Sequence, residues 1–156
     1  MTSRARGGFT LGELMIVVVI IGVVASIAIP AFTRIRMNSR NTRFIEDLQV
    51  FSRAFETYAA KNGTWPASAA LGVVPTGMSG ELRDTKWKET NTVGGRWRWI
   101  YVRSGRSGFA LVLTSGVTAS DAQMLEVDKK IDDGNLSTGM FVRSSAGQFI
   151  YFLQRP

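Results

Sequence analysis

The sequence has 156 residues and contains neither cysteine nor histidine. Without cysteine, a disulfide framework and a thiolate metal site are both excluded, so packing alone must hold the folded part together. Without histidine, the usual catalytic triads and the histidine zinc sites are excluded as well. No nucleophile and base stand at a recognisable spacing. We therefore expect no catalytic residues, no cofactor and no enzymatic activity.

Charge is also absent from a long apolar run, Leu14 to Ile29, and a single carboxylate, that of Glu13, lies at its edge. An ionisable group within a transmembrane stretch costs about 3 kcal/mol on insertion scales and usually marks a functional site with a definite partner. After Glu13 no basic residue occurs before Arg34. The carboxylate therefore lacks a cation at its own depth in the membrane.

The residues before the run explain how a cation can arise. Arg4 and Arg6 precede a glycine pair that ends at Gly8 and gives an open backbone for a protease. Cleavage after Gly8 would free the α-amino group of Phe9, one helical turn from Glu13. The cut would thus create the missing partner, either within one chain or, if neighbouring chains are axially offset, in the next chain.

The string GFTLGEL, the apolar run and Pro30 resemble the N-terminus of type IV prepilins and type II secretion pseudopilins. The resemblance covers roughly the first 35 residues. It implies cleavage between Gly8 and Phe9 by a prepilin peptidase, N-methylation of Phe9, and Glu13 as the assembly carboxylate of a filament. Gly12 is a departure, because a larger residue is frequent there.

The resemblance also implies partners and a location. The chain would cross the inner membrane once with its head in the periplasm, and would then join a filament in the periplasm or at the cell surface. Its partners would be other pilins or pseudopilins, the prepilin peptidase, the inner-membrane assembly platform and the membrane. An alternative function is a minor, tip or competence-type pilin that binds DNA or another ligand. Pilus and secretion pseudopilus remain equally open.

Three other interpretations of the N-terminus compete. A secretory signal peptide with a cleavage site after Ala28 and a plain single-pass anchor both leave Glu13 unexplained. The anchor does fit the length, since residues 9–32 span about 36 Å as a helix. A buried soluble helix is disfavoured by the long β-branched run.

One pattern opposes the expected orientation. Four arginines follow the apolar run and outnumber the two before it, namely Arg34, Arg36, Arg40 and Arg43. The positive-inside rule alone would place the C-terminal side in the cytoplasm. Arginines so close to the membrane can instead lie among the headgroups.

The chain divides into a leader (1–8), an N-terminal helix (9–61, membrane-spanning over 9–32) and a globular head (62–156). At 1.5 Å per residue the helix would be about 80 Å long. Its second half carries a helical stripe of apolar side chains: Met37, Phe44, Leu48, Phe51, Phe55 and Tyr58. Pro30 removes one backbone hydrogen bond and is expected to kink or locally melt the helix.

The residue pattern of the head, together with the long helix before it, predicts an α+β, pilin-like fold with a small antiparallel sheet of about four strands. A long Gly, Pro, Ser and Thr-rich loop is expected over residues 64–95. Trp97, Trp99 and Tyr101 alternate on one strand, so they share the face packed on the helix stripe. The other expected elements are strands at 109–114, 140–143 and 148–153, and a short helix that Ser120 caps and that ends near Ile131.

Charge in the head is unevenly distributed. Seven basic residues and two acidic ones lie between Arg83 and Arg106, whereas five acidic and two basic ones lie between Asp121 and Asp133. Two solvated surfaces explain this pattern. The functional alternatives are a basic patch that meets the acidic patch of the next subunit, or a nucleic-acid surface with interleaved tryptophans.

Asp132, Asp133 and Asn135 surround a glycine turn and are weak calcium candidates. Their spacing matches no EF-hand and lacks its closing glutamate. A helix stop followed by a turn accounts for the same residues, so we predict no metal site.

Overall fold

The computed structural model describes Gly8, residues 10–104 and residues 107–155. The predicted cleavage partner Phe9 and the leader arginines lie outside these residues. The chain divides into two compact units, with the boundary between Asn38 and Ser39. That boundary falls inside the long helix because the helical residues beyond it pack into the head.

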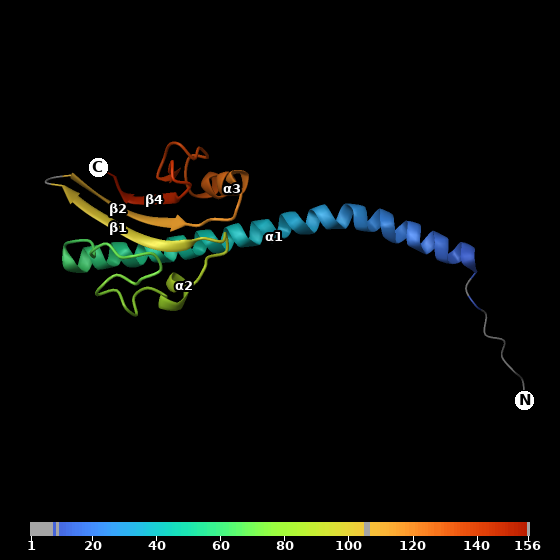
Figure 1. Ribbon diagram of the computed structural model, residues 1–156, viewed down its shortest axis with the longest axis horizontal. Coiled ribbons are helices and arrows are strands. Elements are labelled where there is room, and N and C mark those ends of the chain that lie inside the picture. The colour runs from blue at the N-terminus through green and yellow to red at the C-terminus, as the bar shows by residue number, and fades with distance from the viewer. Residues whose placement is uncertain (1–7, 9, 105–106, 156) are drawn as a thin grey trace, which may run out of the picture. The chain divides into compact units, whose positions relative to one another are not determined.

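The structure contains three helices and four strands in the described residues (Figure 1). In chain order they are α1 (Leu11–Asn62), α2 (Asp84–Lys88), β1 (Arg96–Ser104), β2 (Ser107–Ser115), α3 (Asp121–Ile131), β3 (Phe141–Arg143) and β4 (Phe149–Gln154). The predicted α+β, pilin-like fold is confirmed.

The first unit consists of the apolar part of α1. Its large side chains are exposed, as expected for a segment whose solvent is lipid rather than water. The hydroxyls of Ser26 and Thr33 donate to the carbonyl oxygens of Val23 and Pro30 at 2.7 and 2.8 Å, which satisfies these polar groups within the helix. Helix α1 remains helical through Pro30, and the kink stays a prediction.

In the second unit, the stripe on α1 forms the centre of the core. Phe44, Phe51 and Phe55 are fully buried. Phe55 stacks on Trp99 with the ring centroids 3.8 Å apart, and Phe44 stacks on Trp97 at 5.0 Å. The shared face predicted for the strand tryptophans is therefore confirmed, and it packs on the helix as expected. The helix ends where Gly63 adopts a φ of 68°, a conformation that favours glycine.

The sheet is antiparallel, with the strand order β1-β2-β4-β3. Figure 1 shows β1 and β2 running along the second half of α1. Residues alternate between two faces, so the face opposite the tryptophans carries Ile100, Leu111 and Phe152, which lie side by side in the register of the three strands. The strands begin and end within a few residues of the predicted bounds.

The loop between α1 and β1 is more ordered than its composition predicts. It contains the short helix α2, whose Trp87 is fully buried between Phe51 and Phe55 on α1 and Trp97 on β1. The indole nitrogen of Trp87 donates to the carbonyl oxygen of Val73 at 2.8 Å. A five-residue helix shows no usable apolar period, so the sequence could not reveal it.

Helix α3 begins as predicted. The hydroxyl oxygen of Ser120 accepts a hydrogen bond from the backbone nitrogen of Gln123 at 3.2 Å. The side chain of Gln123 does not return to Ser120. It donates to the side-chain oxygen of the buried Asn41 at 2.8 Å and thereby ties α3 to α1.

Candidate processing and assembly site

Glu13 lies in the first turn of α1 and forms a reciprocal hydrogen-bond pair with Thr10. The carboxylate oxygen Oε2 accepts from the backbone nitrogen and the hydroxyl of Thr10 at 2.8 and 2.9 Å. The backbone nitrogen of Glu13 in turn donates to the Thr10 hydroxyl oxygen at 3.2 Å. This arrangement is a capping box, in which side chains satisfy the free donors at a helix N-terminus.

The capping box was visible in the sequence, since threonine followed three residues later by glutamate before an apolar run is its signature. From the apolar run alone, Glu13 is predicted only as a charge that needs a cation. In the described residues no ion pair to Glu13 is found, and the carboxylate is held by its own helix. The positive end of the helix dipole favours an anion at this position.

Gly8 lies three residues before the start of α1, and a Cβ atom added to it would meet no atom of the described residues within 4 Å. Among the residues that the structure describes, the space around Gly8 is therefore open. The proposed bond between the Phe9 amine and Glu13 involves a residue outside the described range and stays a prediction.

The apolar part of α1 fits a membrane span. Its most apolar 18-residue window has a mean hydropathy of 2.9, and none of that window is buried. Within the described residues it is the one helix long and apolar enough to cross a membrane. The combination of a capped carboxylate and an apolar window with no buried residue distinguishes α1 from the core helix of a soluble protein.

A second cluster lies at the end of α3, where three carboxylates converge. One oxygen from each of Asp128, Asp132 and Asp133 lies within 4.8 Å of the others. Asp128 is fully buried, and neither of its carboxylate oxygens has a hydrogen-bond partner in the described residues. Burial, together with the neighbouring Asp132 and Asp133 carboxylates, raises the pKa of Asp128 above its usual value.

The other two acids of this cluster also accept hydrogen bonds from the turn. Asp133 accepts from the backbone nitrogen of Asn135 at 2.9 Å and from the hydroxyl of Thr138 at 2.6 Å. Asp132 accepts from the backbone nitrogens of Met140 and Phe141 at the start of β3. These bonds match the predicted helix stop and turn. They leave Asp128, which in the sequence is only one of the five acids between Asp121 and Asp133, as the carboxylate of the cluster without a hydrogen-bond partner in the described residues.

The acids between Asp121 and Asp133 are partly engaged by groups of the head itself. Asp121 pairs with Arg143 at 3.0 Å and Glu126 with Lys129 at 2.7 Å, while Asp128 is buried. Asp128 is thus unavailable to a basic neighbour, whereas the side chains of Asp121 and Glu126 remain 59% and 47% exposed beside their partners.

On the basic side, six exposed cations lie on and between α2 and β1: Arg83, Lys86, Lys88, Arg96, Arg98 and Arg103. Among the described residues none of them pairs with a carboxylate within 4 Å. Trp97 and Trp99, however, are at most 1% exposed, so they offer no stacking surface to bases. The nucleic-acid alternative therefore has no specific support in the head.

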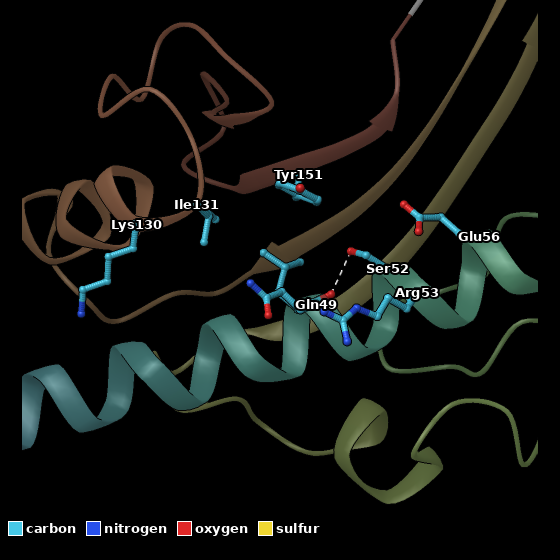
Figure 2. Close-up of a pocket in the computed structure, with 8 residues that line it drawn as sticks. Gln49, Ser52, Arg53, Glu56, Lys130, Ile131 and Tyr151 are labelled. Atoms are coloured by element: carbon cyan, nitrogen blue, oxygen red, sulfur yellow. Dashed lines mark hydrogen bonds between the residues drawn. The ribbon is translucent and has the colours of Figure 1, made fainter.

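A polar groove of about 310 Å³ lies between α1 and the end of α3 with β4 (Figure 2). Its lining residues are Leu48, Gln49, Ser52, Arg53, Glu56, Lys130, Ile131 and Tyr151. The Ser52 hydroxyl donates to the carbonyl oxygen of Leu48 at 2.8 Å. Among the described lining residues, no side chain accepts a hydrogen bond from this hydroxyl as a general base would. Burial raises the pKa of the Tyr151 phenol, with smaller contributions from Asp132 and Glu56. The groove thus lacks an activated nucleophile.

Comparison with known proteins identifies the N-terminal segment. Residues 3–29 match the model of the prokaryotic N-terminal methylation motif. The chain is 28% identical to the type IV major pilin protein PilE1 of Neisseria gonorrhoeae over 154 residues. This alignment covers 99% of this chain and 60% of that protein. These matches confirm the resemblance predicted from the string around Gly8 and Glu13.

Other relatives match over the N-terminal half. The fimbrial protein EcpC of Eikenella corrodens is 38% identical over 77 residues, which cover 49% of this chain and 50% of that protein. The type II secretion system core protein G of Aeromonas hydrophila is 29% identical over 68 residues, which cover 44% of this chain and 48% of that protein. The chain therefore spans between about half and 60% of the length of these curated relatives. No solved structure matches it significantly.

Proposed function

We propose that this chain, which carries the N-terminal methylation motif and is similar to type IV pilins and a type II secretion core protein, is a structural subunit of a pilus or pseudopilus filament. A prepilin peptidase cleaves it between Gly8 and Phe9 and methylates the new amine, and the assembly platform adds it to the filament. The observation that carries the proposal is Glu13, a carboxylate at the N-terminus of a helix that can cross a membrane. The chain has no enzymatic role.

The membrane serves as the reservoir of subunits. Moving an apolar helix from lipid into a bundle of similar helices gains little hydrophobic free energy, so packing and polar contacts must direct assembly. In the reservoir, Thr10 holds the Glu13 carboxylate at its own helix end. In the filament, the Phe9 amine of the same or a neighbouring chain takes over as its partner, so that neither charge is buried alone.

The proposed orientation places the single span in the inner membrane with the head in the periplasm. It rests on the similarity to pilins and runs against the arginine bias around α1. A reporter fused after Pro156 should be active outside the cytoplasm. Activity restricted to the cytoplasm would contradict this orientation.

The cleavage site gives a direct test of processing. Replacing Gly8 with leucine should stop maturation, because a bulky side chain then occupies a position that is sterically open in the native chain. The product should keep the eight leader residues, and mass spectrometry of the membrane fraction measures this. Gly12→Ala is the matched control, since it lies beyond the cut and also meets no neighbouring atom. Normal maturation of the leucine variant would argue against cleavage at Gly8.

A calcium ion at the end of α3 is a second candidate function of the head. The weak sequence candidates Asp132, Asp133 and Asn135 gain a specific argument from Asp128, because its buried carboxylate has no other described partner. Calcium prefers carboxylate and carbonyl oxygens, and buried charges are usually paired or bound to metal. We propose Asp128, Asp132 and Asp133 as the carboxylate ligands.

Thermal unfolding of the full chain in detergent tests this site. Calcium at about 100 times its dissociation constant should stabilise the folded state by about 2.7 kcal/mol relative to chelator. Asp128→Asn should abolish this shift. The control Asp121→Asn removes an exposed carboxylate on the same helix and should leave the shift in place. An unchanged midpoint in the wild-type chain, or an equal shift in Asp128→Asn, would exclude the site.

A further inference from the structure

The head has one end at which α1 enters it, near Arg40. Strand β1 runs beside α1 in the same direction, since Phe44 stacks on Trp97 and Phe55 stacks on Trp99 (Figure 1). The first residues of β1 therefore lie at the entry end of the head, and its last residues lie beside the end of α1.

Four exposed basic residues are held at this entry end. Two lie one turn apart on α1 and two flank the segment between α2 and β1, namely Arg40, Arg43, Lys88 and Arg96. The carbonyl oxygen of Arg40 accepts from the Thr92 hydroxyl at 2.8 Å, which fixes this segment against α1. The guanidinium of Arg96 donates to the carbonyl oxygen of Lys88 at 3.5 Å. We call these four residues the entry-end cations.

The entry-end cations are not neutralised by the head. Among the described residues none of them forms an ion pair with a carboxylate within 4 Å. Glu46 and Glu89 are the exposed acids nearest to them in the sequence, so the cations outnumber these acids by two to one. Asp121, at the start of α3, pairs with Arg143 instead. The surface therefore keeps an excess of positive charge.

This surface follows closely after the candidate membrane span. Arg40 lies eight residues after Phe32 in the continuous helix α1, which is about 12 Å along its axis. The headgroup layer extends about 5–7 Å beyond the hydrocarbon core. Side chains on a helix incline toward its N-terminus, and thus toward the span. Arg36 has this inclination, since its guanidinium lies 4.4 Å from the centre of the Phe32 ring one turn earlier. Long basic side chains can bridge the remaining distance.

We propose that the entry-end cations bind the phosphate groups of anionic phospholipids beside the span, and hold the head against the membrane until the subunit leaves for the filament. Guanidinium groups match phosphate in charge and hydrogen-bond geometry, and basic clusters next to a membrane span attract anionic lipids. The contact also gives a role to the arginine excess after the apolar run. The inference rests on the proposed membrane anchoring of α1 and not on filament formation.

The absence of cysteine allows a unique fluorescent label to report the contact. The full chain with Thr90→Cys carries the label on an exposed residue between Lys88 and Arg96. It is placed in lipid nanodiscs that contain a trace of phosphatidylcholine with a nitroxide quencher on its headgroup. Quenching should be stronger in discs with phosphatidylglycerol than in discs of phosphatidylcholine alone, and high salt should remove the difference. A label at Thr64→Cys, beyond the far end of α1, should show no such difference.

Paired substitutions in the Thr90→Cys chain locate the contact. Arg40→Gln with Arg96→Gln should lower the ratio of docked to undocked heads about 30-fold in the anionic discs, at about fivefold for each basic residue near the surface. The matched control is Arg53→Gln with Arg103→Gln. It removes the same charge from the same two elements, at exposed positions thirteen and seven residues further along the chain. The control pair should dock like the unsubstituted chain.

The outcomes separate this inference from the proposed function. Equal quenching in anionic and neutral discs, with the chain inserted, would overturn the lipid contact and leave the anchoring by α1 standing. An equal loss in both pairs of substitutions would also overturn it, because net charge and not this surface would then bring the head to the membrane. A chain that does not insert into the discs would overturn the anchoring on which both proposals depend.

Discussion

Replacing Glu13 with alanine is expected to leave cleavage after Gly8 intact and to reduce incorporation into filaments by a factor of about 100 or more. In the proposed filament the Phe9 amine is buried opposite Glu13. Removing one partner of a buried pair costs about 3–5 kcal/mol, because the other charge is left without compensation. At about 1.4 kcal/mol per tenfold change, 3 kcal/mol corresponds to the factor given.

The measurement is the ratio of subunits in sheared filaments to subunits in the membrane fraction, with the mature mass recorded in both. Glu13→Gln keeps the size and one hydrogen-bond acceptor but not the charge, so it should resemble alanine if the ion pair matters. Thr10→Val removes the hydroxyl contacts of the capping box and keeps the carboxylate. It should assemble far better than Glu13→Ala. Normal filaments from Glu13→Ala would remove the basis of the mechanism.

Replacing Phe51 with alanine should destabilise the head by about 3–5 kcal/mol, as is typical of large-to-small changes at buried aromatic positions. Phe51 is fully buried, and its ring lies edge-on to Trp87 at 5.0 Å and to Trp97 at 5.3 Å. It joins α1, α2 and β1, so its loss opens a cavity where three elements meet. The expected fall in Tm is on the order of 10–20 °C.

Tryptophan fluorescence during unfolding measures this change, because all four tryptophans lie in the head. The matched control is Phe32→Ala, which makes the same substitution in the same helix at a side chain that is 54% exposed. It should not alter the unfolding of the head. A change below about 1 kcal/mol in Phe51→Ala would show that the aromatic cluster is not the centre of the core.

The long-range architecture was predictable because two periodicities are strong in this sequence. Phe44, Phe51 and Phe55 recur at helical spacing, and Trp97 and Trp99 alternate as in a strand with one buried face. The two patterns fit each other, and the structure stacks their rings directly. The cap at Ser120 was predictable for a different reason, because its hydrogen bond joins two residues that are only three positions apart in the sequence.

Features that depend on tertiary contacts were not predictable. Helix α2 is too short for a period, and its Trp87 is fixed by partners that are distant in the sequence. The same limit applies to Asp128. Counting acids in residues 121–133 treats every carboxylate as surface, whereas burial removes Asp128 and ion pairs engage Asp121 and Glu126. Composition reports the number of charges but not their solvent exposure.

For the candidate site at the N-terminus, the roles of Gly8, Phe9 and Glu13 stay predictions from the sequence, whereas the hydrogen bonds of Glu13 come from the structure. The carboxylate of Glu13 stands out because an apolar run makes any charge conspicuous. Its contact with Thr10 depends on the spacing of three residues between threonine and glutamate. That spacing is common in protein sequences and indicates a capping box only at the start of a helix. The structure adds that the carboxylate is already held by its own helix. Both contacts from Thr10 go to Oε2, so in the proposed filament the amine meets a carboxylate that its own helix already orients.

The most direct test of the central claim is the mass of the N-terminal peptide of the natural, assembled protein. The account predicts a mature chain that starts at Phe9 and carries one methyl group on its α-amino nitrogen. A mature chain that begins at any other residue would place no new cation beside Glu13. That result would contradict both the processing and the assembly mechanism.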